Sequence, residues 1–154
     1  MLFRSGGPGG LGAAPAQVLY GLAANDRFGT TLGGGGDLQG DGFADLLVGA
    51  FQASPMGRSQ AGSVFVFAGG AAGLGETPLR TLHGAAAFDA FGSAIAGATD
   101  LNRDGLADAI IGASGADPAG RAGAGTVSVF LGDRSEEHTS ELQSPCNLVC
   151  RLLL

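Results

Sequence analysis

Residues 100–108 read Asp-Leu-Asn-Arg-Asp-Gly-Leu-Ala-Asp, a pattern that occurs twice in the chain. Oxygen-bearing side chains occupy positions 1, 3, 5 and 9 of this stretch, and a glycine occupies position 6. Ca²⁺ takes about six to eight oxygen ligands, which a short loop supplies when alternate side chains turn inward. The glycine permits a sharp turn that a Cβ would hinder. The spacing therefore indicates a loop suited to a hard cation.

The other copy of the pattern, at residues 37–45, reads Asp-Leu-Gln-Gly-Asp-Gly-Phe-Ala-Asp. The two copies begin 63 positions apart, and at this offset the chain aligns with itself without a gap over residues 6–133. Roughly half of the aligned positions are identical, which chance does not produce. A long, fixed period is typical of solenoids, propellers and arrays. We therefore predict two repeat periods, at 6–68 and 69–131.

The local signals within each period are those of β-strands. Short β-branched and aromatic runs bounded by glycines indicate strands, and because they are apolar on both faces we expect them to be buried on both sides. The expected strands lie at 17–20, 28–36, 46–48, 64–67, 80–83, 91–99, 109–111 and 127–130. No segment shows the long 3.6-residue apolar periodicity that a helix would need, so we predict an all-β chain.

Two of the expected strands, 28–36 and 91–99, consist largely of Gly, Ala, Thr and Ser. Such small residues suit crowded positions where backbones approach closely. Four strands in each period is the number found in a blade of a β-propeller. In that fold we expect Phe28 and Phe91 to be core wedges between blades and not a surface for stacking nucleic-acid bases.

Each period also carries short motifs in a fixed order: Phe-Gly, the acidic loop, Gly-Ala, and Gly-x-Val-x-Val-Phe. This combination resembles the FG-GAP repeat of integrin α-chain propellers and related bacterial proteins, and the match covers nearly all of residues 6–133. The proline that gives the motif its name is replaced by Phe51 in the first period and Ser114 in the second, which leaves the acidic loops untouched. Gln39 stands where Asp or Asn is usual, and its longer, neutral arm should weaken the first site relative to the second.

The resemblance implies a partial β-propeller of about two four-stranded blades, one of them complete at about 28–84 and flanked by partial blades. It makes the Phe-Gly strand the innermost and puts the acidic loop between the first two strands of a blade. Such propellers typically have seven blades, so the chain resembles an internal piece of a longer protein. Because a lone blade exposes both flat faces, we expect the repeat region to be marginally stable or to aggregate on its own.

The acidic loops are predicted to hold one Ca²⁺ each, the second more tightly than the first. The predicted ligands of the first site are Asp37, Gln39, Asp41, the carbonyl of Phe43, and Asp45. Those of the second site are Asp100, Asn102, Asp104, the carbonyl of Leu106, and Asp108. A simpler alternative is an Asp-Gly hairpin turn with solvated carboxylates. Three like charges in so short a loop repel one another unless a cation lies between them, which favours the metal site.

An EF-hand or dockerin loop is the rival family for this pattern. EF-hands need a carboxylate at position 12 of the loop. Val48 and Ile111 occupy that position here, inside apolar strands, which decides against the rival.

Both ends of the chain look like translated sequencing-library adapter. Residues 134–144 read RSEEHTSELQS, and residues 1–5 contain LFRS. We assign 1–5 and 134–154 to adapter-derived sequence and not to the fold; a genuine basic and apolar C-terminal extension is the alternative. This assignment removes the residues that would otherwise suggest a metal or redox site, namely His138, Cys146 and Cys150.

The overall composition excludes several classes of protein. Thirty glycines without a Gly-X-Y period exclude collagen, and 45% hydrophobic residues argue against disorder. A formal charge of −6 with no lysine argues against a nucleic-acid partner. No apolar run approaches the roughly 20 residues that span a bilayer, so no membrane segment is expected.

Few other side chains are candidates for chemistry. His83, the one histidine of the repeat region, occupies the repeat position of Tyr20, which favours a structural role in an outer strand over catalysis. Arg58 and Arg121 recur at equivalent positions, where they would form an ion pair with a neighbouring blade or face a ligand.

We therefore predict a non-enzymatic, calcium-binding propeller that serves as an adhesion or recognition scaffold, outside the cell or at its surface. The resemblance implies a protein or glycan ligand on the loops opposite the acidic ones, at 51–61, 84–90 and 114–123. One alternative is that these are non-catalytic blades of a larger secreted hydrolase, such as a phospholipase-D-like enzyme. An intracellular scaffold is disfavoured, because such loops often bind Ca²⁺ too loosely for resting cytosol.

Overall fold

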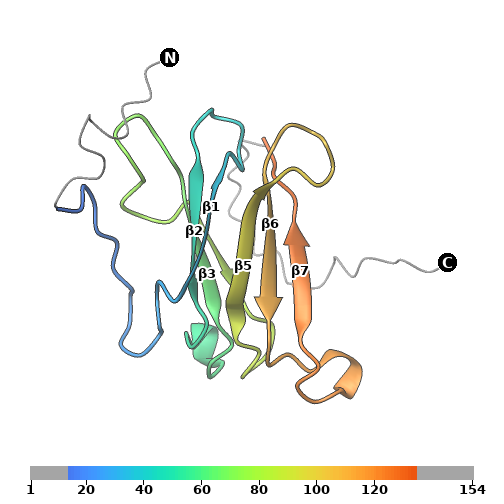
Figure 1. The fold of residues 1–154 in the computed structure, drawn as a ribbon. Helices are drawn as coiled ribbons and strands as arrows, with labels where there is room; N and C mark the ends of the chain where they lie inside the picture. Colours follow the sequence, from blue (N-terminus) through green and yellow to red (C-terminus); the bar gives the residue numbers. More distant parts are fainter. Residues whose placement is uncertain (1–13, 135–154) are drawn as a thin grey trace.

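Two antiparallel β-sheets lie face to face in the computed structural model, which describes residues 14–134 (Figure 1). The first sheet has the order β1-β2-β3-β4, with β1 at Thr31–Gly36, β2 at Asp45–Ala50, β3 at Ser63–Phe67 and β4 at Arg80–His83. The second has the order β5-β6-β7, with β5 at Phe91–Thr99, β6 at Asp108–Ala113 and β7 at Thr126–Phe130. Short 3-10 turns η1 (Pro55–Gly57) and η2 (Pro118–Gly120) occupy equivalent places in the two repeats. The prediction of an all-β chain with one four-stranded blade and part of the next is confirmed.

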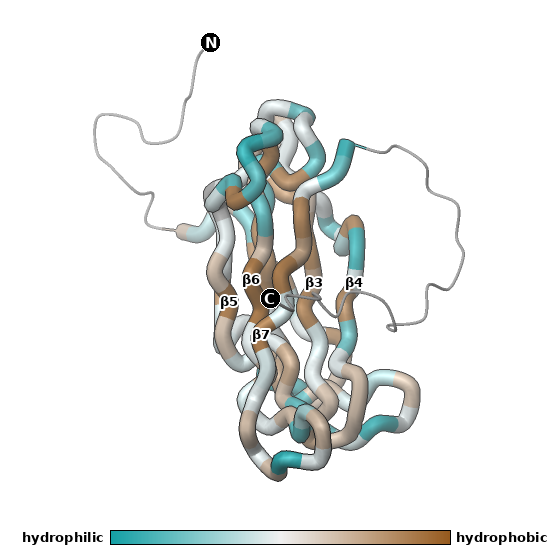
Figure 2. The backbone as a smooth tube through the Cα atoms, turned by 90° about the vertical axis from the view of Figure 1, so that its right-hand side faces the viewer, coloured by the Kyte–Doolittle hydropathy of each residue, from teal (hydrophilic) through white to brown (hydrophobic). Residues whose placement is uncertain are grey.

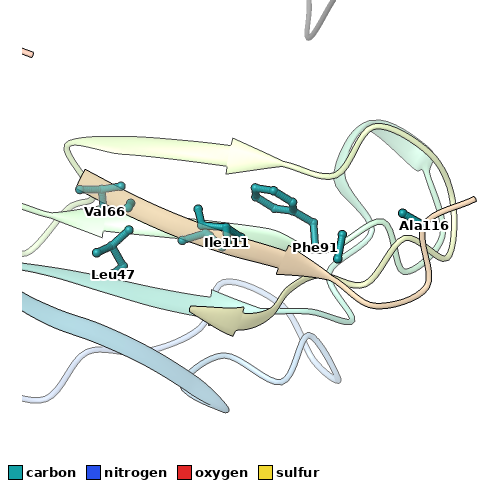
Figure 3. Packing of buried hydrophobic residues seen from close by; sticks show 8 residues of the cluster. Leu47, Val66, Phe91, Ile111 and Ala116 are labelled. Atoms are coloured by element: carbon teal, nitrogen blue, oxygen red, sulfur yellow. The ribbon is translucent and has the colours of Figure 1, made fainter. Parts of the chain in front are cut away.

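The core lies between the two sheets, where Leu47, Val64 and Val66 of the first face Ile111 and its neighbours on the second (Figure 3). In the first sheet Leu47 pairs with Val66, so their side chains share the face that turns toward β6. Burying a side chain of this size contributes about 1.5–3 kcal/mol. Packing of one repeat on the next is therefore a main source of stability in this chain.

Small residues allow the two sheets to approach closely along β1 and β5. The hydroxyl of Thr31 donates to the carbonyl oxygen of Gly92 at 2.6 Å, which ties the first repeat to the second. A Cβ at Gly33 would lie 2.5 Å from Cγ2 of Ile95, and one at Gly49 would lie 2.7 Å from the Gly92 carbonyl oxygen. The expectation that these glycine-rich strands occupy crowded positions is confirmed.

Of the two repeat phenylalanines, Phe91 lies between the two blades as predicted, and Phe28 does not. Phe91 is buried in the core between the sheets and makes an edge-to-face contact with Phe130, with ring centroids 6.2 Å apart. Phe28 is half-buried and makes the equivalent contact with Phe67 at 6.3 Å on the outer side of the first sheet. Each ring therefore packs on the third strand of its own blade, and among the described residues only Phe91 is a wedge between blades.

One predicted strand is absent: residues 17–20 form no strand, although their repeat equivalent, 80–83, is β4. The physical reason is the missing partner. β4 exists because it pairs with β3, for example through Leu82 opposite Val64, whereas the described residues place no strand beside 17–20. The side chain of Gln17 instead hydrogen-bonds the backbone of Leu74 through both its amide atoms.

The prediction that the central strands are buried on both faces holds for β3 and fails for β7. Every residue of β3 is buried, and Val64 is 0% exposed; its repeat equivalent Val127 in β7 is 70% exposed. Figure 2 looks at the molecule from the side of β7, the edge strand of its sheet, whose residues are exposed or half-buried. Among residues 14–134 no third sheet covers that face. The neighbour, and not the sequence of the strand, determines the burial.

The strands carry the loops to two opposite ends of the molecule. The loops that join β1 to β2 and β5 to β6 lie at one end, and η1, η2 and the segment before β5 lie at the other (Figure 1). Residues 1–13 and 135–154 lie outside the described part of the chain, and with them most of the segments assigned to adapter. No helix in residues 14–134 is long and apolar enough to cross a membrane.

Candidate metal-binding loops

The two acidic patterns form equivalent loops at one end of the sheets. The first acidic loop, residues 37–45, leads from β1 into β2, and the second, residues 100–108, leads from β5 into β6. The positive φ values of Gly42 (87°) and Gly105 (86°) explain the glycine at position 6, because residues with a Cβ rarely adopt this conformation.

The last aspartate of each loop is buried and anchors it to the blade. Asp45 is 2% exposed and accepts hydrogen bonds from the backbone N–H groups of Leu38 (2.8 Å) and Gly69 (2.9 Å). Asp108 is 1% exposed and accepts the equivalent bonds from Leu101 (2.6 Å) and Gly132 (2.9 Å). Each carboxylate therefore joins the start of its own loop to the residue that lies shortly after the third strand of the blade.

The first aspartate of each loop accepts bonds from the backbone that turns around it. Asp37 receives the N–H groups of Gly40 at 2.6 Å and Gly42 at 2.8 Å. Asp100 receives those of Asp104 at 3.2 Å and Gly105 at 2.9 Å. The loop thus curls over the carboxylate at position 1, as an Asp-Gly turn does.

Side chains at positions 3 and 5 contact each other in both loops. Nε2 of Gln39 donates to Asp41 at 2.6 Å, and Nδ2 of Asn102 donates to Asp104 at 2.7 Å. The residues at position 7, whose carbonyl oxygens are predicted metal ligands, also donate their N–H groups to the carboxylate at position 5. Phe43 donates to Asp41 at 2.8 Å, and Leu106 donates to Asp104 at 2.8 Å. All ten predicted ligand residues therefore lie in two matching loops.

The carboxylates do not converge on a single point. Within residues 14–134, no three side chains of Asp, Glu, His or Cys lie close enough together to hold a metal ion. Asp37 and Asp100 face N–H groups of their own loops, as in a hairpin turn, whereas Asp45 and Asp108 are buried and not solvated as that alternative has it. One atom is left over, however, because Oε1 of Gln39 is buried and has no hydrogen-bond partner. Buried polar atoms without a partner are rare in native proteins, and an ion is one of the groups that satisfies them.

The electrostatics of the first acidic loop also favour a cation. Burial raises the pKa of Asp45 against the effect of its two N–H donors, and the charges of Asp41 and Asp37 raise it further. Burial acts to raise the pKa of Asp37 too, but the backbone N–H groups of the loop, led by that of Gly42, outweigh it and lower the pKa. The ionised form is thus favoured at Asp37 and disfavoured at Asp45 in the same loop. A bound cation would stabilise the ionised form of both carboxylates.

In the second acidic loop the pKa of Asp104 is lowered, first by the N–H of Leu106 and then by the amide of Asn102. Because its charged form is favoured, Asp104 is ionised at neutral pH and is available to a cation. The set of donors, carboxylate and amide oxygens from alternate positions, fits Ca²⁺ in both loops.

The two loops differ in how much of the protein surrounds them. The first acidic loop lies against the second, because the carbonyl oxygen of Asp37 accepts the N–H of Ala107 at 2.9 Å. Leu106 is buried by this contact, whereas its equivalent, Phe43, is exposed. The bond is shared by both loops, and position 7 is buried only in the second loop.

The other candidates from the sequence have structural contacts. Nδ1 of His83 lies 2.9 Å from Oγ of the buried Ser63, a contact that joins β4 to β3. Arg58 donates to the carbonyl oxygen of Ala85 at 3.4 Å and so links two loops of the end opposite the acidic loops. This contact is neither the ion pair nor the ligand contact that the sequence left open.

One residue of interest was missed by the sequence analysis. Phe88 is 62% exposed at the end opposite the acidic loops and has a φ of 68°, a left-handed conformation that is uncommon for a bulky side chain. Its repeat equivalent, Asn25, has the same φ of 68°, and Asn tolerates this region well. The signal was present in the repeat alignment, as an aromatic residue at a position that suits Asn.

Comparison with known proteins agrees with this architecture. The family model of the FG-GAP repeat matches residues 28–67 and 91–130, one stretch in each sheet. Integrin alpha-IIb of Homo sapiens is 40% identical over 111 residues, which cover 71% of this chain and 10% of that protein. Integrin alpha-V of Gallus gallus is 39% identical over 106 residues, covering 66% and 10%, and Integrin alpha-5 of Xenopus laevis is 36% identical over 110 residues, covering 68% and 10%.

The chain thus spans about a tenth of the length of these relatives. The two matched stretches coincide with the repeats that pack on each other through Val64 and Ile111. The chain belongs to the FG-GAP repeat family, with two integrin α-like repeats that form neighbouring propeller blades.

Proposed function

We propose that the chain is a calcium-binding, non-enzymatic scaffold of the integrin α type, in which the acidic loops fix the blades and the opposite end recognises a ligand. The observation that carries the proposal is the pair of matching loops, each anchored by a buried aspartate and each presenting the same set of oxygen atoms. The similarity to integrin α chains supports a place outside the cell or at its surface.

In the first site, Asp37, Gln39, Asp41, the Phe43 carbonyl and Asp45 would hold the ion. In the second, Asp100, Asn102, Asp104, the Leu106 carbonyl and Asp108 would hold it. A bound Ca²⁺ supplies positive charge that neutralises the carboxylates of a loop. The unpartnered Oε1 of Gln39 supports the first site.

We expect the second site to be the tighter one. Asn102 has a shorter arm than Gln39, and Leu106 at position 7 of the second loop is buried, whereas its equivalent Phe43 is exposed. A loop that is already held in place loses less conformational entropy when it binds.

The buried anchors link each loop to the rest of its blade. Asp45 and Asp108 tie the loops to Gly69 and Gly132, just beyond β3 and β7. Holding these carboxylates in one arrangement would therefore also hold the third strand of each blade, which leads back to the opposite end. The acidic loops would act on recognition only through this rigidity.

The end opposite the acidic loops is the part that we propose meets a protein or glycan ligand. Phe88 and Met56 are exposed there, and Arg58 joins their two loops. The left-handed conformation of Phe88 is costly for a large side chain, and strain of this kind is often found at functional sites. An exposed aromatic side chain is a common anchor in protein recognition.

Calorimetric titration with Ca²⁺ tests the metal sites. We expect about two ions per chain, and loss of the tighter one in Asp104→Ala. Glu76→Ala is the matched control, because it removes one exposed carboxylate outside both loops and should leave both binding events in place. Absence of heat at millimolar Ca²⁺ in a sample shown to be folded by circular dichroism would refute the proposal.

A further inference from the structure

The guanidinium of Arg58, at the end opposite the acidic loops, makes only weak contacts. One N–H group donates to the carbonyl oxygen of Ala85 at 3.4 Å, and another donates to the sulfur of Met56 at 3.2 Å. The first of these bonds is long, and a thioether sulfur is a weak acceptor. The third nitrogen, Nε, is buried and has no hydrogen-bond partner. A buried donor of a charged group that lacks an acceptor is destabilising.

The described part of the chain offers Arg58 no negative charge. Neither of its two side-chain contacts is with a carboxylate. The one acidic residue of the adjoining segment 84–90 is Asp89, which is buried and accepts the N–H of Ala86 at 2.7 Å. The guanidinium, which stays protonated in proteins, therefore lies beside a carboxylate-bearing segment without pairing to it.

The charge of Arg58 also acts on β4. Burial lowers the pKa of His83, and the charge of Arg58 lowers it further. A guanidinium paired with a carboxylate would have a much smaller effect on a neighbour, because the two opposite charges largely cancel at a distance. The shift at His83 thus agrees with a cation that lacks a counter-charge.

The loop that carries Arg58 is held in a fixed shape. The N–H of Arg58 bonds the carbonyl oxygen of Pro55 at 2.9 Å, which closes the turn η1. The N–H of Phe88 bonds the carbonyl oxygen of Ser59 at 2.8 Å, which joins this loop to segment 84–90. A group on a fixed loop loses less conformational entropy when it binds a ligand.

Exposed apolar side chains lie next to this charge. The sulfur of Met56 contacts the guanidinium, and Met56 is 73% exposed. Phe88, whose backbone is bonded to the residue after Arg58, is 62% exposed. Six of the 14 acidic residues of the chain lie in the acidic loops, at the other end of the strands (Figure 1). A ligand that combines a negative charge with apolar groups therefore complements this end.

We propose that this end binds an acidic segment of a protein ligand, in which the carboxylate of an Asp or Glu side chain pairs with Arg58 and a neighbouring apolar side chain packs on Phe88. The inference rests on the proposed function, since it names the class of ligand for the recognition end. The planar fork of a guanidinium matches a carboxylate and forms two parallel bonds with it. Arg58 is half-buried and its present contacts are weak, so a carboxylate displaces them at little cost.

Nuclear magnetic resonance of the full chain with isotope-labelled arginine tests the contact. The probe is the peptide acetyl-Gly-Asp-Leu-Gly-amide, and its matched control is acetyl-Gly-Asn-Leu-Gly-amide, which has the same shape without the charge. We expect the Asp peptide to shift the Nε–H resonance of Arg58 to saturation and the Asn peptide to bind about tenfold more weakly. The bound carboxylate should also raise the pKa of His83, because it cancels the charge that lowers it.

Three variants separate the parts of the site. Arg58→Lys keeps the charge but loses the fork, and should weaken binding of the Asp peptide about fivefold or more. Phe88→Asn carries the residue of the equivalent position Asn25, which has the same φ, and should weaken both peptides by a similar factor since both contain the leucine. Arg80→Lys changes an exposed arginine of β4 outside the site and should leave binding unchanged. Circular dichroism would establish that each variant is folded.

Several results would overturn the proposal. Equal affinity for the two peptides would remove the role of the carboxylate, and so would an Arg58 resonance that neither peptide shifts at millimolar concentration. An equal effect of acetate at the same concentration would show a general anion site only. Tighter binding of methyl glucuronide than of the Asp peptide would indicate an acidic glycan in place of a protein. Titration with Ca²⁺ keeps the failures distinct, because two bound ions without a peptide effect contradict the acidic ligand and not the calcium-binding scaffold.

Discussion

Strands β3 and β7 have almost the same sequence, Ser-Val-Phe-Val-Phe and Thr-Val-Ser-Val-Phe, and opposite surroundings. β3 lies in the middle of its sheet with apolar clusters on both faces, and all five of its residues are buried. β7 is the edge of its sheet, and no residue in it is fully buried. The third strand of each repeat therefore keeps an apolar sequence that suits the middle of a blade. It does so even in the second sheet, where no neighbouring sheet among the described residues buries it. The stability of the two blades should differ accordingly.

The largest expected effect is the loss of stability when a glycine of β2, packed against the second sheet, is replaced by alanine. Gly49→Ala would drive a methyl group into Thr31 and to within 2.7 Å of the Gly92 carbonyl oxygen. We expect a loss of about 3 kcal/mol in the free energy of unfolding, because the clash is with backbone that cannot move freely. Gly112→Ala, the equivalent change in the second blade, meets only Ala94 at 3.3 Å and should cost less than about 1 kcal/mol. Urea denaturation of both variants measures the difference, and equal losses would contradict it.

Valines at equivalent positions give a smaller difference. Val64→Ala leaves a cavity between the sheets and should lower the free energy of unfolding by about 2 kcal/mol. Val127→Ala removes methyl groups that are already in water and should cost less than about 0.5 kcal/mol. Urea denaturation of both variants measures the two losses. A comparable loss in Val127→Ala would show that the face of β7 is covered.

The aspartate anchors should show no difference between the blades. Asp45→Asn and Asp108→Asn each replace a buried acceptor of two backbone N–H groups, and the new amide turns an N–H toward one of those donors. We expect each to cost about 1.5 kcal/mol, since both anchors have the same contacts. Thermal unfolding of the two variants in the presence of a chelator checks this. A clearly smaller loss for Asp108→Asn would show that the end of β7 is loosened by its open edge.

The smallest expected effect is a pH dependence from His83, on the strand that pairs with β3 and has no equivalent beside β7. Burial lowers the pKa of His83 below 6.5, and the charge of Arg58 lowers it further. As the pH falls below about 6.5, His83 therefore binds a proton more readily in the unfolded chain than in the folded one. The free energy of unfolding is unaffected by His83 above about pH 6.5 and decreases as the pH falls below that value. His83→Tyr, with the residue of the equivalent position, should unfold with less dependence on pH between about 5 and 7. Identical pH profiles would contradict the effect.

Much of the fold was predictable, because the repeat fixes the phase of the strands. The apolar runs around Leu47 and Ile111, the glycines beside them and the acidic loops recur at one offset, and every one of the expected strands except 17–20 exists. The error at 17–20 has a simple cause, since a pattern predicts that a segment can pair but not that a partner is beside it. The exposed face of β7 was mispredicted for the same reason.

The candidate site was predictable in position and less so in arrangement. The ten residues fall in the two loops as expected, and the spacing alone places Asp45 and Asp108 at the start of β2 and β6. What the spacing does not contain is that these two side chains are buried and reach Gly69 and Gly132, which lie 24 residues further along the chain. It also does not show Oε1 of Gln39 without a partner, because that depends on how the loop closes around it.

The side-chain bond between Thr31 and Gly92 has a consequence for the order in which the molecule assembles. Every strand pair in both sheets joins consecutive strands, so each sheet can form from contacts that are close in sequence. The docking of one sheet on the other depends on contacts such as Thr31 to Gly92, 61 residues apart. Local contacts form quickly and distant ones are slow to close. The boundary between the blades should therefore be the last part to assemble and the first to open, and amide hydrogen exchange should detect its opening before either sheet unfolds.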